Sequence, residues 1–113
     1  MIKSKSDMLV VTTEAIPGRE IESAIGLVRG STVRAKHVGS DIVASLRSLV
    51  GGEVKEYAQL LAAAREQAYD RMVAEALSLG ADAVVGVRME TSTIMQSASE
   101  VVFYGTAVRL KRP

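Results

Sequence analysis

The feature that most constrains the fold is a long helical pattern that runs from Glu53 to Gly80. Its apolar side chains recur at steps of three and four residues, which places them on one stripe of an α-helix. Alanine is frequent there, and it both favours helix and lets a neighbouring element approach closely. The stripe consists of Val54, Tyr57, Leu61, Ala64, Ala68, Met72 and Ala76. The segment is therefore predicted as one helix that ends at Gly80.

Two β-like segments precede this helix. Residues 8–13 form a short β-branched run before the Pro17-Gly18 turn, and Ile21 to Lys36 form a longer run. The glycines of the longer run predict a bend or bulge near Gly30. Its alternation places four apolar residues on one face: Ile25, Leu27, Val33 and Ala35. We therefore expect a short strand followed by a long, bent one.

A shorter helix is predicted between the long strand and the long helix. Residues 40–50 follow helical spacing, with Ser40 or Asp41 as the N-terminal cap and Gly51-Gly52 as the stop. Histidine 37, the only histidine of the chain, falls just before this cap. The segment "AKHVGSD" is thus interpreted as a strand exit, a glycine turn and a helix cap.

Two strands follow the long helix, at residues 81–91 and 99–110, with a hairpin connection through 92–99. The predicted order is β-β-α-α-β-β, an α+β fold in which one long and one short helix cover one face of a mainly antiparallel sheet. Val84, Val101 and Phe103 have the parity opposite to the main apolar faces of their strands. Both sheet faces are then partly apolar, which favours oligomerisation.

Length and composition predict one domain over residues 1–113, with a core at about 8–110 and basic tails at both ends. The net charge of +1 gives no electrostatic case for nucleic acid. No apolar stretch is long enough to span a bilayer, so no membrane partner is expected. The absence of cysteine excludes disulfides and thiolate metal sites. We expect a soluble, cytoplasmic protein.

Enzymatic motifs are missing from the sequence. A nucleophilic hydrolase needs a nucleophile, a base and an orienting acid, and the chain has one histidine and no cysteine. The glycine-containing segments 26–32 and 80–86 lack the Gly-Lys ending of a phosphate loop. We therefore expect a protein that is not an enzyme, with no catalytic and no cofactor-binding residues.

Metal-ligating residue types are few. His37 and Asp41 lie four residues apart, but one imidazole and one carboxylate make at most half of a closed site. Only a symmetric assembly would gather several copies of each around one axis. Methionine offers a soft sulfur ligand, yet Met72 and Met89 are better explained as core residues.

Four segments together resemble the YbjQ-like family. They are "TTEAIPG" at residues 12–18, the run from Val38 to Met72, "LGADAVVGVRME" at 79–90 and "EVVFYGTAV" at 100–108. The resemblance covers residues 8–110 approximately. It implies a small prokaryotic α+β fold similar to a dodecin subunit, and assembly into a homopentamer. The heavy-metal-binding label of the family is an inference from structural comparison and carries no established ligand set.

The sequence departs from the family pattern at two places. The family has Asn and a charged residue around "HVGSD", and its common "RFD" is Arg88-Met89-Glu90 here. The first hypothesis is an oligomeric, non-enzymatic protein that binds a divalent or heavy-metal ion through His37, Asp41 and Glu90 repeated by symmetry. The alternatives are a small-molecule-binding module at subunit interfaces, where Phe103, Tyr104 and Tyr57 are available, and a purely structural assembly protein.

Overall fold

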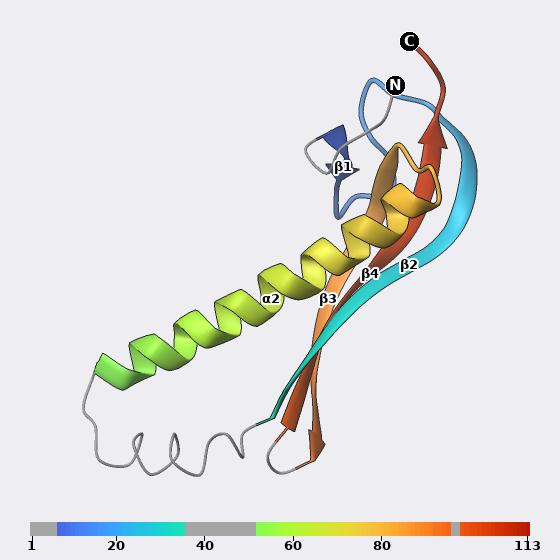
Figure 1. Ribbon diagram of the computed structural model, residues 1–113. Helices are drawn as coiled ribbons and strands as arrows, with labels where there is room; N and C mark the ends of the chain where they lie inside the picture. Colours follow the sequence, from blue (N-terminus) through green and yellow to red (C-terminus); the bar gives the residue numbers. More distant parts are fainter. Residues whose placement is uncertain (1–6, 36–51, 96–97) are drawn as a thin grey trace.

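The computed structural model of the chain describes residues 7–35, 52–95 and 98–113. Its elements are β1 (Leu9–Val10), β2 (Ile21–Ala35), α2 (Gly52–Ser78), β3 (Ala83–Met95) and β4 (Ala98–Leu110). The strands form one mixed sheet in the order β1-β3-β4-β2, and α2 packs on one of its faces (Figure 1). The predicted α+β class is confirmed. The predicted helix at 40–50 lies outside the described residues, so the full order β-β-α-α-β-β stays a prediction.

Strand β4 is the centre of the sheet. It pairs antiparallel with β2 and with β3, while β1 pairs parallel with the start of β3. The last two strands are longer than predicted, because β3 continues to Met95 and pairs there with Ala98 of β4. The β-branched residues Thr93 and Ile94 explain the extension, since they fit a pleated strand better than a loop.

The predicted bend or bulge near Gly30 is wrong. Both register shifts of β2 fall earlier, between Ile21 and Gly26. A Cβ atom at Gly30 would collide with the backbone of Ala68 and Met72 in α2. Gly30 therefore serves the close approach of a strand to a helix, for which only a residue without a side chain leaves room.

The register of β2 after its second shift decides which of its side chains lie under α2. Val28 is 0% exposed, whereas Leu27 is 64% exposed and Val33 is 54% exposed. The buried row under α2 is thus Val28, Gly30 and Thr32, and the predicted apolar face of this strand is wrong at Leu27 and Val33. Each of the two shifts adds one residue to β2, and the two together restore the alternation of the strand. The second shift places Ile25, which packs with the core under α2, and Leu27 on opposite faces.

The core has separate parts on the two faces of the sheet. Under α2, Met72 and Val73 of the helix pack with Val28, Val84 and Ala107 of the sheet. On the other face, the loop that follows β1 packs on β3 and β4, where Ala83, Val85, Val108 and Leu110 are buried. A bulge in β3 at Gly86, whose φ is +62°, lets both Val84 and Val87 join the helix side. Among the described helical residues, none forms a helix long and apolar enough to cross a membrane.

Candidate functional site

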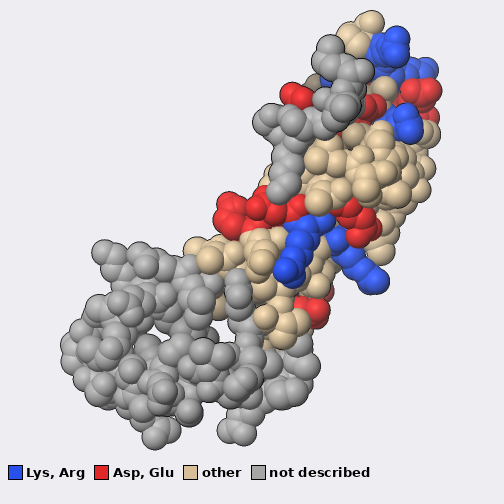
Figure 2. All heavy atoms as spheres, viewed as in Figure 1, with Lys and Arg blue, Asp and Glu red and all other residues tan. Residues whose placement is uncertain are grey.

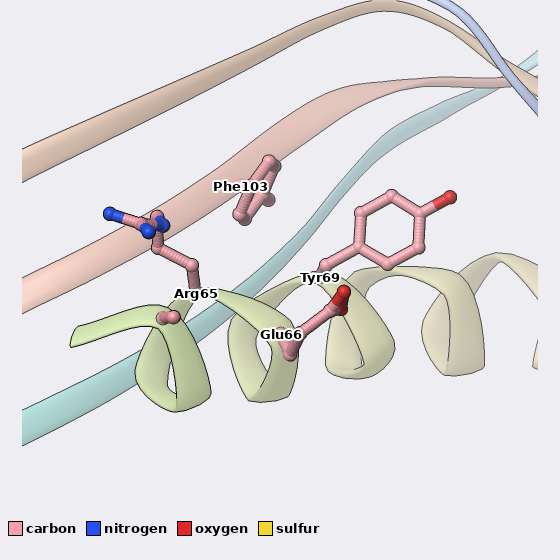
Figure 3. Close-up of a pocket in the computed structure, with 5 residues that line it drawn as sticks. Arg65, Glu66, Tyr69 and Phe103 are labelled. Atoms are coloured by element: carbon pink, nitrogen blue, oxygen red, sulfur yellow. The ribbon is translucent and has the colours of Figure 1, made fainter. Parts of the chain in front are cut away.

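A groove lies between α2 and β4. Its volume is about 320 Å³, and it is lined by Ala62, Arg65, Glu66 and Tyr69 of α2 and by Phe103 of β4. Figure 3 shows Phe103 standing on its strand across from the helix that carries Arg65, Glu66 and Tyr69. The volume is at the lower end of the range typical of small-molecule sites, about 300–1,000 Å³.

The two aromatic rings of the groove fix its shape. The rings of Tyr69 and Phe103 lie with their centroids 5.6 Å apart and an interplanar angle of 88°, an edge-to-face contact. Phe103 lies in the row of β4 side chains that points toward the helix, beside buried Val101. Its cross-strand neighbour Met89 is 44% exposed, so the apolar floor of the groove continues onto β3.

The surroundings of the Tyr69 hydroxyl favour its neutral form. Desolvation by burial raises the pKa of Tyr69 above its ordinary value, and the carboxylates of Glu66 and Asp70 raise it further. Tyr69 therefore stays a neutral phenol at neutral pH and is neither a nucleophile nor a base there. Arg65 and Glu66 are exposed, which places one cation and one anion at the rim of an apolar floor.

Glu90, a predicted metal ligand, lies away from this groove. Its register partner is Val102, so its side chain lies on the sheet face opposite to α2, in the row next to Tyr104. The Tyr104 hydroxyl donates a hydrogen bond of 3.3 Å to Oε1 of the exposed Glu90 carboxylate. The other predicted ligands, His37 and Asp41, lie outside the described residues. Within the described ranges, no three His, Asp or Glu side chains come together as a metal site.

A second concavity, of about 560 Å³, lies at the end of the sheet that carries the C-terminus. It is lined by charges of both signs, namely Asp7, Glu22, Asp82, Arg19, Arg109 and Arg112. Asp82 ties the end of β4 in place, because its Oδ2 accepts a hydrogen bond of 2.8 Å from the Leu110 amide. Figure 2 shows acidic and basic side chains intermingled at this end, so the region does not select anions or cations.

The sequence predicted the burial of some of these residues correctly and of others wrongly. Met72 is fully buried, as predicted, but Met89 is not a core residue. Glu66 is an exposed residue of α2 that also lines the groove. One sequence feature could have indicated the groove. Phe103, the only phenylalanine of the chain, lies on the face of its strand opposite to the main apolar face, and a large apolar side chain there needs a packing partner.

Comparisons with known proteins agree on the family and the fold. The model of the YbjQ family, described as "Putative heavy-metal-binding", matches residues 8–111. A UPF0145 protein of Colwellia psychrerythraea is 53% identical, over 93% of this chain and 100% of its own length. One from Archaeoglobus fulgidus is 52% identical, over 95% of this chain and 99% of its own.

A solved structure supports the fold alone. It is a Pediococcus pentosaceus protein of unknown function from the DUF74 family, with a TM-score of 0.61 and 16% identity. The match covers 92% of this chain and 98% of that one.

Proposed function

Because the chain belongs to the YbjQ family, we propose that it is a self-assembling, non-enzymatic binding protein of the cytoplasm. The observation that carries the proposal is the position of its exposed apolar side chains. Of the large hydrophobic residues that the structure shows exposed, Leu9, Leu27, Val33 and Met89 lie on β1, β2 and β3, and none lies on the central strand β4. Apolar side chains along both margins of a sheet favour contact with further copies.

The assembly that we propose is a closed homopentamer. Most soluble oligomers are symmetric, and a head-to-tail contact between two different margins of a sheet closes into a ring when the rotation allows it. The resemblance to the family supports five subunits. Each ring would then repeat every exposed carboxylate about its axis.

A soft heavy metal does not fit the described donors of one copy. The chain has no cysteine and one histidine, and the described candidate Glu90 offers only carboxylate oxygen. Carboxylates suit hard divalent cations rather than soft ions. We therefore propose that any metal ion is held by side chains of several copies, with the carboxylates of Glu90 and Asp41 and the imidazole of His37 as the candidates.

The alternative ligand is a small molecule in the groove between α2 and β4. This candidate rests on a specific observation, because the groove combines an aromatic floor from Tyr69 and Phe103 with Arg65 and Glu66 at its rim. An amphipathic ligand with one flat apolar part would fit such a floor. At a subunit interface the groove would gain a further wall.

Native mass spectrometry of the untagged, chelator-washed protein tests the proposal. We expect a single ring mass, and a stoichiometric mass increase per ring after addition of Mn²⁺, Zn²⁺, Cu²⁺ or Ni²⁺ that Glu90→Gln reduces. A ring that takes up no metal but retains an organic mass from the cell would support the groove instead. A monomeric protein that retains neither would sink the proposed function.

A further inference from the structure

We infer that the groove between α2 and β4 binds a free α-amino acid with an aromatic side chain. In this complex, Arg65 holds the carboxylate of the ligand, Glu66 holds its ammonium group, and its ring lies against Tyr69 and Phe103. The inference rests on the groove as the small-molecule site of the proposed function, and it names the class of ligand.

The groove carries two opposite charges that do not pair with each other. Arg65 and Glu66 are consecutive, exposed residues of α2. Consecutive side chains leave a helix about 100° apart, so they do not face each other. Figure 3 places the Arg65 side chain on the Phe103 side of the groove and Glu66 beside Tyr69. Neither charge forms an ion pair or a hydrogen bond with another described residue.

This arrangement matches a ligand with two charges better than a ligand with one. A purely anionic ligand would be attracted by Arg65 and repelled by Glu66, and a purely cationic ligand would meet the reverse. A ligand that carries both charges satisfies both residues. A guanidinium binds a carboxylate through two parallel N–H donors, and a carboxylate accepts from an ammonium group in a similarly charge-assisted bond.

The short spacing of the two residues limits the distance between the charges of the ligand. Neighbouring Cα atoms lie about 3.8 Å apart, so Arg65 and Glu66 reach out from almost the same point of the helix. An α-amino acid carries its ammonium and carboxylate groups on one carbon atom, and its head group therefore fits between the two side chains.

The floor of the groove favours an aromatic side chain on that carbon. The rings of Tyr69 and Phe103 meet edge to face with their centroids 5.6 Å apart, and both residues are partly exposed. A further ring adds to such a pair by another edge-to-face or offset contact. The volume of about 320 Å³ is small for a binding site, which suits an amino acid better than a larger cofactor.

Fluorescence anisotropy of L-tryptophan with the untagged full chain tests the inference. The protein contains no tryptophan, so the indole fluorescence comes from the ligand alone. L-Tryptophan amide lacks the carboxylate and resembles the start of a peptide, whereas N-acetyl-L-tryptophan lacks the ammonium group and resembles the end of one. We expect L-tryptophan to bind about 10-fold more tightly than either. L-Phenylalanine should displace it, and L-alanine should not.

Substitutions assign each charge of the ligand to its residue. Arg65→Gln should weaken the binding of L-tryptophan by about 10-fold without weakening that of the amide. Glu66→Gln should weaken the binding of L-tryptophan similarly, without weakening that of N-acetyl-L-tryptophan. Phe103→Leu keeps an apolar floor but removes a ring, and it should weaken L-tryptophan by about 3-fold.

Matched controls change the same charges elsewhere. Arg29 is exposed on the sheet face opposite to α2, and Glu75 is exposed on α2 outside the groove. Arg29→Gln and Glu75→Gln should leave all three affinities unchanged, and circular dichroism shows that each variant is folded.

Two results would overturn the amino-acid site. Equal affinities for the three indole probes, or binding of L-tryptophan that Arg65→Gln and Glu66→Gln leave unchanged, would show that the two charges do not select the ligand. A ring in native mass spectrometry that binds none of the three probes would overturn the site and leave the proposed self-assembly standing. A monomeric chain that binds L-tryptophan as expected would do the opposite.

Discussion

The two sides of the sheet face beneath α2 differ sharply. Gly30 of β2 and Met89 of β3 both pair with Phe103, so they stand at equivalent positions on either side of the central strand. Beside Gly30, Val28 and Thr32 are buried, whereas Met89 is 44% exposed. Both strands pair antiparallel with β4, and the difference in burial comes from the position of α2, which packs mainly on β2 and β4.

The helix position follows from a missing side chain. Gly30 allows the backbone of α2 to approach β2, and the small side chains of Ala64 and Ala68 lie at the same contact. Because α2 lies close to β2, it leaves part of β3 exposed on the same sheet face, and the groove lies between α2 and β4. Close packing in one half of the sheet therefore produces the open surface in the other half.

Gly30→Ala should disturb the packing of α2 on β2 more than any other single substitution discussed below. The added Cβ would strike helix backbone, which cannot rotate away as a side chain does, so we expect a loss of unfolding free energy above about 3 kcal/mol. The control Ser31→Ala, one position along on the other sheet face, should cost less than about 1 kcal/mol. Urea denaturation followed by circular dichroism measures both. A Gly30→Ala protein as stable as wild type would show that α2 does not rest on this glycine.

Met72→Ala tests whether the core between α2 and the sheet supplies the free energy of unfolding. Met72 is fully buried beneath the helix, and its truncation should lower the unfolding free energy by about 3 kcal/mol through lost burial and a residual cavity. Leu79→Ala removes a side chain of similar size that is 44% exposed, and it should cost less than about 1 kcal/mol. Equal midpoints of denaturation for the two variants would contradict the assignment of the core.

The sequence anticipated the elements better than the surfaces between them. Residue periodicity located α2 as 53–80, against the observed Gly52–Ser78, because the helical stripe is a local property. It misplaced Leu27 and Met89, since the bulges of β2 and β3 depend on how strands pair. The groove could not be predicted for a related reason. It depends on the close approach of Gly30 to the backbone of Ala68, two residues that are far apart in the sequence. The candidate site residues Glu90, Asp41 and His37 stay predictions.

Thr32→Val tests a buried hydroxyl on the part of β2 that α2 covers. Thr32 is 3% exposed under α2, and its Oγ1 has no hydrogen-bond partner among the described residues. Replacing an unsatisfied buried hydroxyl by a methyl group of the same shape should raise the unfolding free energy by about 1 kcal/mol. The comparison variant Thr32→Ser keeps the hydroxyl and should not gain stability. If the valine variant is less stable than wild type, the hydroxyl has a partner elsewhere in the chain.

Tyr69→Phe should change the free energy of unfolding least, and its effect should depend on pH. Tyr69 lies in the groove beside Phe103, between the part of the sheet that α2 covers and the exposed part of β3. Burial, with Glu66 and Asp70, raises its pKa above the ordinary value of 10.0, so folding favours the neutral phenol. This contribution to stability is fully present below pH 10.0 and is lost as the pH rises through the folded-state pKa. The phenylalanine variant should match wild type at pH 7 and lose less stability than wild type above pH 10.0. Parallel stability curves for the two proteins across that range would mean that the phenol is not desolvated, and that the groove is open to water along its whole length.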